Sequence, residues 1–480
     1  MNIWPLLPNT VQTSAPTQDS DLPVLPSAAI AALPAGGPDC DRFDWQEAWY
    51  PIAYLSDLDK SKLTRFVLLD TALVIWWEPA AAAWRVFADQ CPHRLAPLSQ
   101  GRVNEAGQLE CPYHGWAFSG EGACEYIPQQ PEAIQANLSS RACATALPTR
   151  LCQDLLFVYP GKPENAFQVQ VPLIEPLIED PNGWVMLNTF RDLPYDALTL
   201  LENVLDASHI PYTHHKTVGK RENAAPMEME VLESDRQGFC GIWPEGPRKG
   251  KLGTQHTRFV APSLMYHDLT SKQFGRTMTV VYAVPTRKGE CRLFARFPFK
   301  FSSKLPGLFI KLTPRWYSHI GNNGVLEDDQ IFLHIQEREL EKAGSKPYAQ
   351  ACYLPTQADR YVLAFRQWVS NFKADPFPGQ SLPGEATQAD LLDRYHSHTQ
   401  HCGSCAPALA NIQRLRQLAA LLAFISLSLT PLAAIALSTR AGGLLSALTL
   451  TAGGIWYGLG QLERRFYQGR PVPPRNFSTK

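Results

Sequence analysis

Two short loops constrain this chain more than any other feature, because each begins with Cys-Pro and carries a histidine within the next two residues. The first loop contains Cys91 and His93, and the second, after 17 intervening residues, contains Cys111 and His114. Glycines follow the second loop and permit the tight backbone that brings a loop close around a metal. We therefore predict that the four side chains share one metal centre.

Two thiolates and two imidazoles are the ligand set of a Rieske [2Fe–2S] cluster, in which histidines replace two cysteines on one iron. A four-ligand zinc site is the alternative, although Cys-x-His paired with Cys-x-x-His is an unusual zinc spacing. Respiratory and photosynthetic Rieske proteins resemble one another in a disulfide beside the ligands, but Ala96 and Tyr113 occupy those positions here. The loops therefore indicate the oxygenase type of centre, which passes electrons to a second metal.

The segment ENVLDASHIPYTHH supplies a candidate for that second metal through Asp206, His209 and His214. Asp206 and His209 are expected to share a helix face, and Pro211 is expected to bend the chain so that His214 turns back. Two imidazoles and one carboxylate form the facial triad that leaves open positions on non-haem Fe(II). A solvated helix face is the alternative for each residue alone, and the upstream loops favour iron.

The carboxylate ligand is expected from the acidic cluster in VLEDDQIFLHIQE, which has the composition of a helix. Asp329 lies three residues before Phe332 and four before Leu333, so it is predicted to face the core. Glu327 and Asp328 are expected to be more solvated. Asp329 is the predicted ligand, and Asp328 is the alternative.

The predicted fold class is α+β. Short runs of β-branched and aromatic residues precede Pro160, whereas later segments alternate strands with helical periodicity. The predicted parts are a disordered N-terminal extension (1–42), an antiparallel β Rieske domain (43–160), a catalytic mononuclear iron domain with an antiparallel sheet and helices (161–400), a Cys-x-x-Cys linker (401–416), a transmembrane helical hairpin (417–462) and a basic C-terminal tail (463–480).

Charge and cysteine content limit the kinds of partner and the cellular compartment that we expect for this chain. Lys+Arg 44 against Asp+Glu 45 gives a net charge of -1, which disfavours a nucleic-acid partner. The 11 cysteines are too sparse for a disulfide framework, and the N-terminus resembles no signal or transit peptide, so we expect a reducing compartment.

Two uncharged runs of 22 residues, 417–438 and 441–462, predict a membrane hairpin. Each could cross a hydrocarbon core of about 30 Å as a helix. Buried soluble helices or an interfacial hairpin are the alternatives. Most arginines lie outside the two runs, at positions 414, 416, 464, 465 and 470, and only Arg440 lies in the turn between them. This bias predicts that both ends of the hairpin face the cytoplasm or stroma.

Cys402 and Cys405 lie just before the first run, with histidines at 396, 398 and 401 nearby. An exposed thiol pair two residues apart can act as a redox switch. Weak metal binding and the absence of any role are the alternatives.

These motifs together resemble the Rieske-type non-haem iron oxygenases, and most closely the pheophorbide a oxygenase-like branch. The resemblance extends from FDWQEAWYPIAYLSDLD at Phe43 through CPHRLAPLSQGRV, CPYHGWAF, NVLDASHIPYTHH and EDDQIFLHIQER to RYHSHTQHCGSC at Arg394 and the hairpin. The Cys-x-x-Cys and the hairpin narrow the likeness to this branch.

The resemblance implies a role for each site residue. Cys91, His93, Cys111 and His114 would hold the cluster, and His209, His214 and an acid would hold the iron. Asp206 would carry the electron across a subunit boundary in a head-to-tail homotrimer.

The resemblance also implies partners. Reduced ferredoxin would donate electrons, and oxygen from O2 would enter a tetrapyrrole such as pheophorbide, chlorophyllide or protochlorophyllide, at a cyanobacterial or plastid-type membrane. The alternative is a non-catalytic redox component of a translocon, in which the Cys-x-x-Cys pair is regulatory.

Overall fold

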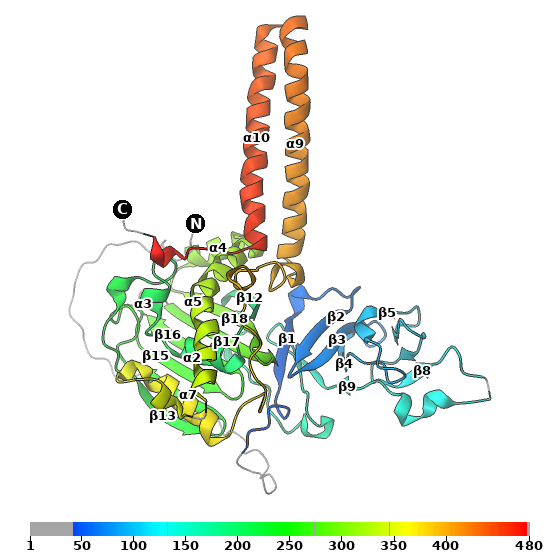
Figure 1. Ribbon diagram of the computed structural model, residues 1–480, viewed down its shortest axis with the longest axis vertical. Coiled ribbons are helices and arrows are strands. Elements are labelled where there is room, and N and C mark those ends of the chain that lie inside the picture. The colour runs from blue at the N-terminus through cyan, green and yellow to red at the C-terminus, as the bar shows by residue number, and fades with distance from the viewer. Residues whose placement is uncertain (1–41, 132, 272–274, 345, 478–480) are drawn as a thin grey trace.

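The computed structural model describes residues 42–131, 133–271, 275–344 and 346–477, so the predicted N-terminal extension lies almost wholly outside the described residues. A β-rich module, a larger module of sheet and helices, and a long helical hairpin follow one another along the chain (Figure 1). Both modules contain antiparallel sheet, and the helices gather in the second. The predicted α+β class is confirmed.

The N-terminal module consists of three small sheets. One has the order β1-β11-β10, the second β2-β3-β4-β9 and the third β5-β6-β7-β8. The third is built from very short strands: the first Cys-Pro loop precedes β5, and the second joins β6 to β7. A small core shared with the second sheet includes Trp76 of β3, Phe87 of β4 and Phe118 of β7. The bounds are β1 Tyr50–Tyr54, β2 Thr64–Leu68, β3 Thr71–Glu78, β4 Ala83–Ala88, β5 Arg102–Val103, β6 Leu109–Glu110, β7 Ala117–Phe118, β8 Cys124–Tyr126, β9 Ala146–Leu147, β10 Thr149–Cys152 and β11 Leu155–Val158.

One antiparallel sheet organises the second module, with the order β12-β18-β17-β16-β15-β14-β13. The N-terminal module packs against it: the Tyr54 hydroxyl of β1 donates to the Ala295 carbonyl of β18 at 2.9 Å. The two modules therefore share one continuous hydrophobic core. The bounds are β12 Val185–Leu193, β13 Glu230–Asp235, β14 Gly238–Trp243, β15 Gln255–Val260, β16 Leu264–Ser271, β17 Gly275–Arg287 and β18 Glu290–Phe301.

Helices cover one face of this sheet, and the longest of them, α5, runs across it (Figure 1). Aromatic packing fixes α7 to the sheet, since the Trp368 ring lies 5.1 Å from that of Phe259. The bounds are α1 Glu175–Glu179, α2 Ala197–Leu205, α3 Ile210–Thr213, α4 Lys304–Leu312, α5 Arg315–Ala343, α6 Tyr348–Ala351, α7 Arg360–Asn371 and α8 Gln388–Leu391.

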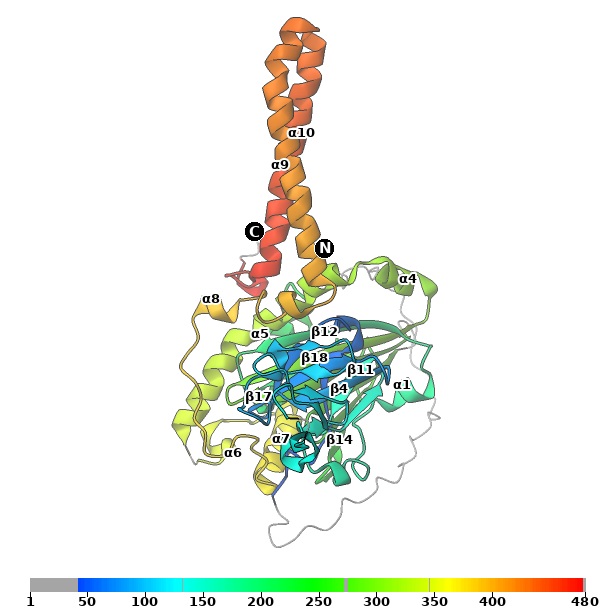
Figure 2. The same cartoon turned by 90° about the vertical axis from the view of Figure 1, so that its right-hand side faces the viewer.

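The hairpin of α9 (Cys405–Ala436) and α10 (Thr439–Tyr467) projects away from the body as two antiparallel helices (Figure 2). The helices approach closely, because a Cβ on Gly442 would lie 2.7 Å from the Ala434 Cβ. Among the described residues, α9 alone is long and apolar enough to cross a membrane, and little of it is buried. Since α9 begins at Cys405, most of the predicted linker is helical.

Candidate metal centres and substrate cavity

The two Cys-Pro loops have the same backbone design. In the first, the Cys91 N–H donates to the Ala96 carbonyl at 2.8 Å and the Leu95 N–H returns to the Cys91 carbonyl at 2.9 Å. In the second, Cys111 bonds in the same way to Trp116 at 2.8 Å and to Gly115 at 3.1 Å. Leu95 and Gly115, at equivalent positions, have φ of 59° and 72°. Each loop is therefore a tight turn around its cysteine.

The side chains of these loops converge in a way that fits a Rieske cluster. The rings of His93 and His114 lie 4.6 Å apart, and Trp116 stacks on His93 at 4.6 Å. Both cysteines are buried, whereas His93 is exposed. Burial raises the pKa of the Cys91 thiol to about 12, and a metal ion bound at that sulfur would favour the thiolate. The donor set has its sulfurs inside and its imidazoles at the surface.

The second predicted group also comes together. His209 Nε2 lies 3.2 Å from His214 Nε2, and Asp329 places one carboxylate oxygen 3.7 Å from His209 Nε2 and the other 3.2 Å from His214 Nε2. The three donor atoms all lie within 4.8 Å of one another, which suits one metal ion. Burial lowers the pKa of His214, but Asp329 and Asp328 outweigh it and raise that pKa to about 9. A metal ion bound by His214 Nε2 would take the place of that proton.

The prediction that Asp206 and His209 share a helix face is wrong. Helix α2 ends at Leu205, Asp206 has extended backbone, and His209 precedes α3. His209 Nδ1–H instead donates to the Asp206 backbone carbonyl at 2.5 Å, and the Asp206 carboxylate lies 3.6 Å from the same nitrogen. Pro211 lies in the first turn of α3, which begins at Ile210, and that turn brings His214 back toward His209 as predicted.

The expectation that Glu327 and Asp328 are more solvated is also wrong. Asp328 is 2 % exposed, less than Asp329 at 7 %. Its carboxylate lies 3.4 Å from His214 Nδ1 and accepts a hydrogen bond from Thr217 at 2.7 Å. Glu327 is held by Arg191 and Arg394. Because this part of α5 is enclosed on several sides, Glu327 and Asp328 have buried cationic or imidazole partners rather than water.

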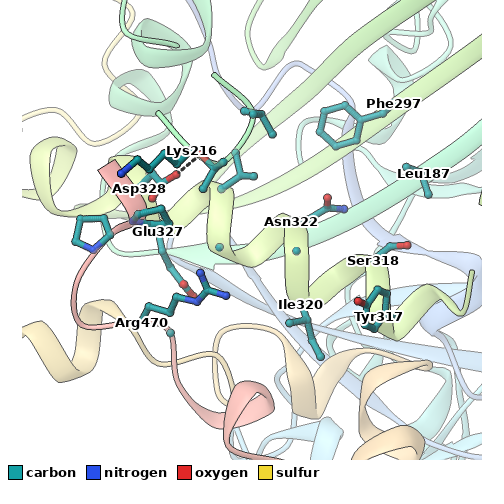
Figure 3. A pocket seen from close by; sticks show the side chains of 18 of the residues that line it. Leu187, Lys216, Phe297, Tyr317, Ser318, Ile320, Asn322, Glu327, Asp328 and Arg470 are labelled. Atoms are coloured by element: carbon teal, nitrogen blue, oxygen red, sulfur yellow. Dashed lines mark hydrogen bonds between the residues drawn. The ribbon is translucent and has the colours of Figure 1, made fainter. Parts of the chain in front are cut away.

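A cavity of about 1760 Å³ lies between α5 and the sheet (Figure 3). Its wall includes Asp328 and Thr217, which both contact His214, so it reaches within one side chain of the predicted iron ligands. In Figure 3, Asp328 and Lys216 lie at one end and Phe297 and Leu187 of the sheet at the other. The interior is mainly apolar, and basic side chains from the end of α10 and the tail lie along one side: Arg464, Arg465, Arg470 and Arg475.

The Cys-x-x-Cys pair is not exposed, contrary to what a redox switch requires. Cys402 and Cys405 are each 1 % exposed and carry free thiols. They face the imidazoles of His319 and His398. His398 was among the neighbouring histidines in the sequence, but His319 of α5 could not be placed there, because it lies more than eighty residues earlier.

Comparison with known proteins agrees with this architecture. A family model of the Rieske [2Fe-2S] domain matches residues 48–147, and one of pheophorbide a oxygenase matches residues 259–346. The chloroplast pheophorbide a oxygenase of Oryza sativa subsp. japonica is 37% identical over 89% of this chain and 84% of its own length. Flavonoid 8-hydroxylase 2 of Ocimum basilicum, also chloroplastic, is 32% identical over 85% of this chain and 83% of its own.

Solved structures show the same fold. The crystal structure of dicamba monooxygenase bound to dicamba superposes with a TM-score of 0.54 at 22% identity, covering 68% of this chain and 97% of that one. Fold and sites thus define a Rieske-type non-haem iron oxygenase, an enzyme with a [2Fe–2S] cluster and a mononuclear iron. The chain belongs to the pheophorbide a oxygenase family.

Two residues that support the iron site were not singled out from the sequence. Thr217 fixes the Asp328 carboxylate, and its position just after the two histidines was the only signal available. Arg475, near the C-terminus, donates to the Asp328 carbonyl at 2.7 Å and to the Thr213 carbonyl at 3.2 Å. The spacing of residues along the sequence cannot indicate a contact between residues that lie so far apart in the chain.

Proposed function

We propose that this oxygenase inserts oxygen from O2 into a tetrapyrrole such as pheophorbide, chlorophyllide or protochlorophyllide, with reduced ferredoxin as the electron donor. The observation that carries the proposal is the large apolar cavity beside His214, bordered by basic side chains. Pockets for drug-sized ligands measure about 300–1,000 Å³, so this cavity has room for a larger flat ligand. The arginines along its side suit the carboxylates of such a pigment.

In this proposal, Cys91, His93, Cys111 and His114 hold the cluster, and His209, His214 and Asp329 hold the iron. The two metals supply electron transfer and oxygen activation. Asp328 orients His214 through its Nδ1–H, and Asp206 holds His209 from the opposite side of the site. The aromatic side chains of β18 keep water from the substrate face.

The cluster is expected to serve a neighbouring subunit of a homotrimer. The strands that carry the Cys-Pro loops, β5 to β8, lie at the opposite end of the body from α3, which separates the two metal histidines (Figure 1). His93 is exposed, together with the neighbouring Leu95 and Tyr113. An exposed imidazole in an apolar surround suits docking against another chain, where Asp206 would meet it.

We further propose that α9 and α10 span a membrane, in a plastid or cyanobacterial setting, with the catalytic modules on the stromal or cytoplasmic side. The apolar residues of α9 point outward, which distinguishes it from a core helix. Helix α4 lies on the side of the body from which the hairpin emerges (Figure 2), and Leu305, Leu308, Phe309 and Leu312 form an exposed apolar face on it. Such a face would rest on the lipid surface.

The decisive experiment compares the wild type with His209→Ala. Anaerobically purified protein would be incubated with reduced ferredoxin, O2 and a panel of pigments, with products identified by mass spectrometry. We expect a tetrapyrrole product from the wild type and none from the variant, which keeps its Rieske absorption. A variant as active as the wild type would favour the non-catalytic alternative instead.

A flavonoid is the second candidate substrate, because the relative from Ocimum basilicum is a flavonoid 8-hydroxylase at 32% identity. A flavone occupies a small part of a cavity of about 1760 Å³. The same panel therefore includes flavones, and faster turnover of a flavone than of any pigment would replace the tetrapyrrole proposal.

A further inference from the structure

The base of the hairpin contains a second set of metal-type donors, which the proposed reaction does not use. His319 of α5, His398 of the following loop region, Cys402 and Cys405 are all buried, at 1, 0, 1 and 1 % exposure. One donor atom from each lies within 4.8 Å of the other three. Buried polar groups need partners, so this convergence calls for an explanation.

The two imidazole rings point their unprotonated nitrogens toward each other. His319 Nε2 lies 2.8 Å from the Asn188 carbonyl, and His398 Nδ1 lies 2.6 Å from the Phe190 carbonyl, both on β12. A carbonyl oxygen only accepts, so each ring carries its hydrogen on that outer nitrogen. The inner nitrogens, His319 Nδ1 and His398 Nε2, are 3.0 Å apart. Neutral rings in these tautomers repel each other there unless a cation binds both.

The sulfur atoms complete the coordination shell. Cys402 Sγ lies 3.4 Å from His319 Nδ1, and Cys405 Sγ lies 3.4 Å from both inner nitrogens. The backbone N–H groups of Ser404 and Cys405 each donate to Cys402 Sγ at 3.4 Å, which stabilises a thiolate. Zinc bonds of about 2.3 Å to sulfur and 2.0–2.1 Å to nitrogen impose donor separations of roughly 3.4–3.8 Å in a tetrahedron. The sulfur–nitrogen separations of 3.4 Å lie at the lower end of this range, and the nitrogen–nitrogen separation of 3.0 Å is shorter, so the two rings move slightly apart when the ion binds.

We propose that His319, His398, Cys402 and Cys405 bind one Zn²⁺ ion in a closed, structural site. Two nitrogens and two sulfurs in a buried tetrahedron are the donor set that zinc prefers, and the outer hydrogen bonds to β12 fix both rings. The ion joins the first residue of α9 to α5 and thereby fastens the hairpin to the helix that also carries Asp329.

A disulfide between Cys402 and Cys405 is the competing arrangement. It would remove both thiolates and leave the inner nitrogens of His319 and His398 facing each other without a ligand. The two arrangements predict different metal contents, so measurement on the wild type separates them without any variant.

The experiment is metal analysis and zinc-edge X-ray absorption of the full chain, purified anaerobically with its Rieske absorption intact. We expect about one zinc per chain in addition to iron, bound by two sulfurs and two nitrogens. Absence of zinc, a Cys402–Cys405 disulfide in peptide mass spectra, or a zinc shell of nitrogen and oxygen alone would overturn the proposal.

Variants assign the ion to these residues. The double variant Cys402→Ser, Cys405→Ser and the single variant His319→Ala should lose the zinc while the Rieske absorption reports that the N-terminal module is folded. His401→Ala is the matched control, because His401 is exposed beside the site, and it should keep the zinc. Zinc that persists in the double variant, or disappears only in Cys91→Ser, would place the ion elsewhere and refute the assignment.

Discussion

At the scale of single residues, the proposed iron site depends on how each imidazole nitrogen is used. His214 offers Nε2 to the metal side while its Nδ1 faces Asp328, and His209 offers Nε2 while its Nδ1 bonds to Asp206. The outer partners therefore fix which nitrogen of each ring is free to bind iron. Asp328, which the sequence offered as a rival ligand, occupies the outer position on His214.

Asp328→Asn should weaken the iron site without removing a ligand. The neutral amide removes the negative charge of the oxygen that faces both His214 Nδ1 and the Thr217 hydroxyl, and loss of such an outer partner typically costs about 10–100-fold in metal affinity or activity. Iron retained after dialysis against a graded chelator measures the effect. Glu339→Gln, on the exposed face of the same helix, is the control and should match the wild type. Equal iron retention in Asp328→Asn and the control would contradict this role.

Asp206→Asn should separate iron binding from turnover. His209 is oriented by the Asp206 backbone carbonyl, which the substitution keeps, so iron should remain. The carboxylate charge beside His209 is lost, and if it couples the two metals, turnover should fall at least about tenfold. The rate at which O2 reoxidises the reduced cluster with substrate present measures that coupling. Wild-type reoxidation in Asp206→Asn, or loss of its iron, would contradict the prediction.

At the scale of elements, the sequence predicted what depends on local pattern. Strands and helical segments are both found after Pro160, as expected from the spacing of apolar residues, and α2 and β17 are examples. Predictions failed where a distant partner decides the outcome. Asp328 was expected to be solvated because charged residues of a helix usually face water. Instead, Arg475 and His214, which come from other parts of the chain, lie against its carboxylate. Likewise, no local signal placed His319 beside Cys402.

His267 shows how strands hold the end of α2 beside the iron site. It is buried on β16, its Nε2–H donates to the Val204 carbonyl at 2.9 Å, and its Nδ1 accepts from Thr257 at 2.8 Å. Burial lowers its pKa from 6.5 to about 4. The ring is therefore neutral, and it fixes the last turn of α2 just before Asp206.

Folding stability should fall in acid because of His267. Between pH 6.5 and pH 4 the unfolded chain binds the proton and the folded chain does not, so the free energy of unfolding decreases as pH falls through this window. The contribution lost between pH 7 and pH 5 is about 2 kcal/mol. Urea unfolding in detergent at both pH values measures it. His267→Gln should reduce the pH dependence by that amount, whereas His256→Gln, exposed on β15, should not; equal slopes in both variants would contradict it.

At the scale of the whole molecule, the hairpin and the catalytic module are one unit. Arg394 beside β12 donates to the Arg465 carbonyl of α10 at 2.9 Å and pairs with Glu327 of α5. The chain after α10 then returns over the iron site, where the Lys216 ammonium donates to the Phe477 carbonyl at 2.7 Å. The hairpin and the proposed iron site are therefore connected through direct contacts of Arg394 and of the C-terminal tail.

The full chain should behave as an integral membrane protein. Helix α9 exposes apolar side chains along its length, and their burial in lipid stabilises insertion. We expect the protein to remain in the membrane fraction after extraction with alkaline carbonate. Replacing Leu421 and Leu432 of α9 with Asp should release it, since each charge lies within the apolar run and a charge at the centre of a spanning helix costs about 2.5–3.5 kcal/mol on insertion scales. Full recovery of the wild type in the soluble fraction would contradict the spanning hairpin.

The tail beyond the hairpin should influence the iron site directly. The Arg475 guanidinium lies 3.7 Å from the Asp328 carboxylate as well as donating to its carbonyl, and both side chains are mostly buried. Arg475→Gln leaves the Asp328 charge with one fewer partner, and breaking a buried pair in this way is costly because the remaining charge stays buried. Asp328 should then hold His214 less firmly, and iron should dissociate up to about tenfold faster. Arg470 is exposed in the same tail, so Arg470→Gln tests whether the loss of any positive charge from the tail is enough to speed iron release. This control should release iron at the wild-type rate. If both variants keep iron equally well, the tail covers the site without supporting it, and any coupling between the hairpin and the iron site must run through contacts at the base of the hairpin, such as those of Arg394.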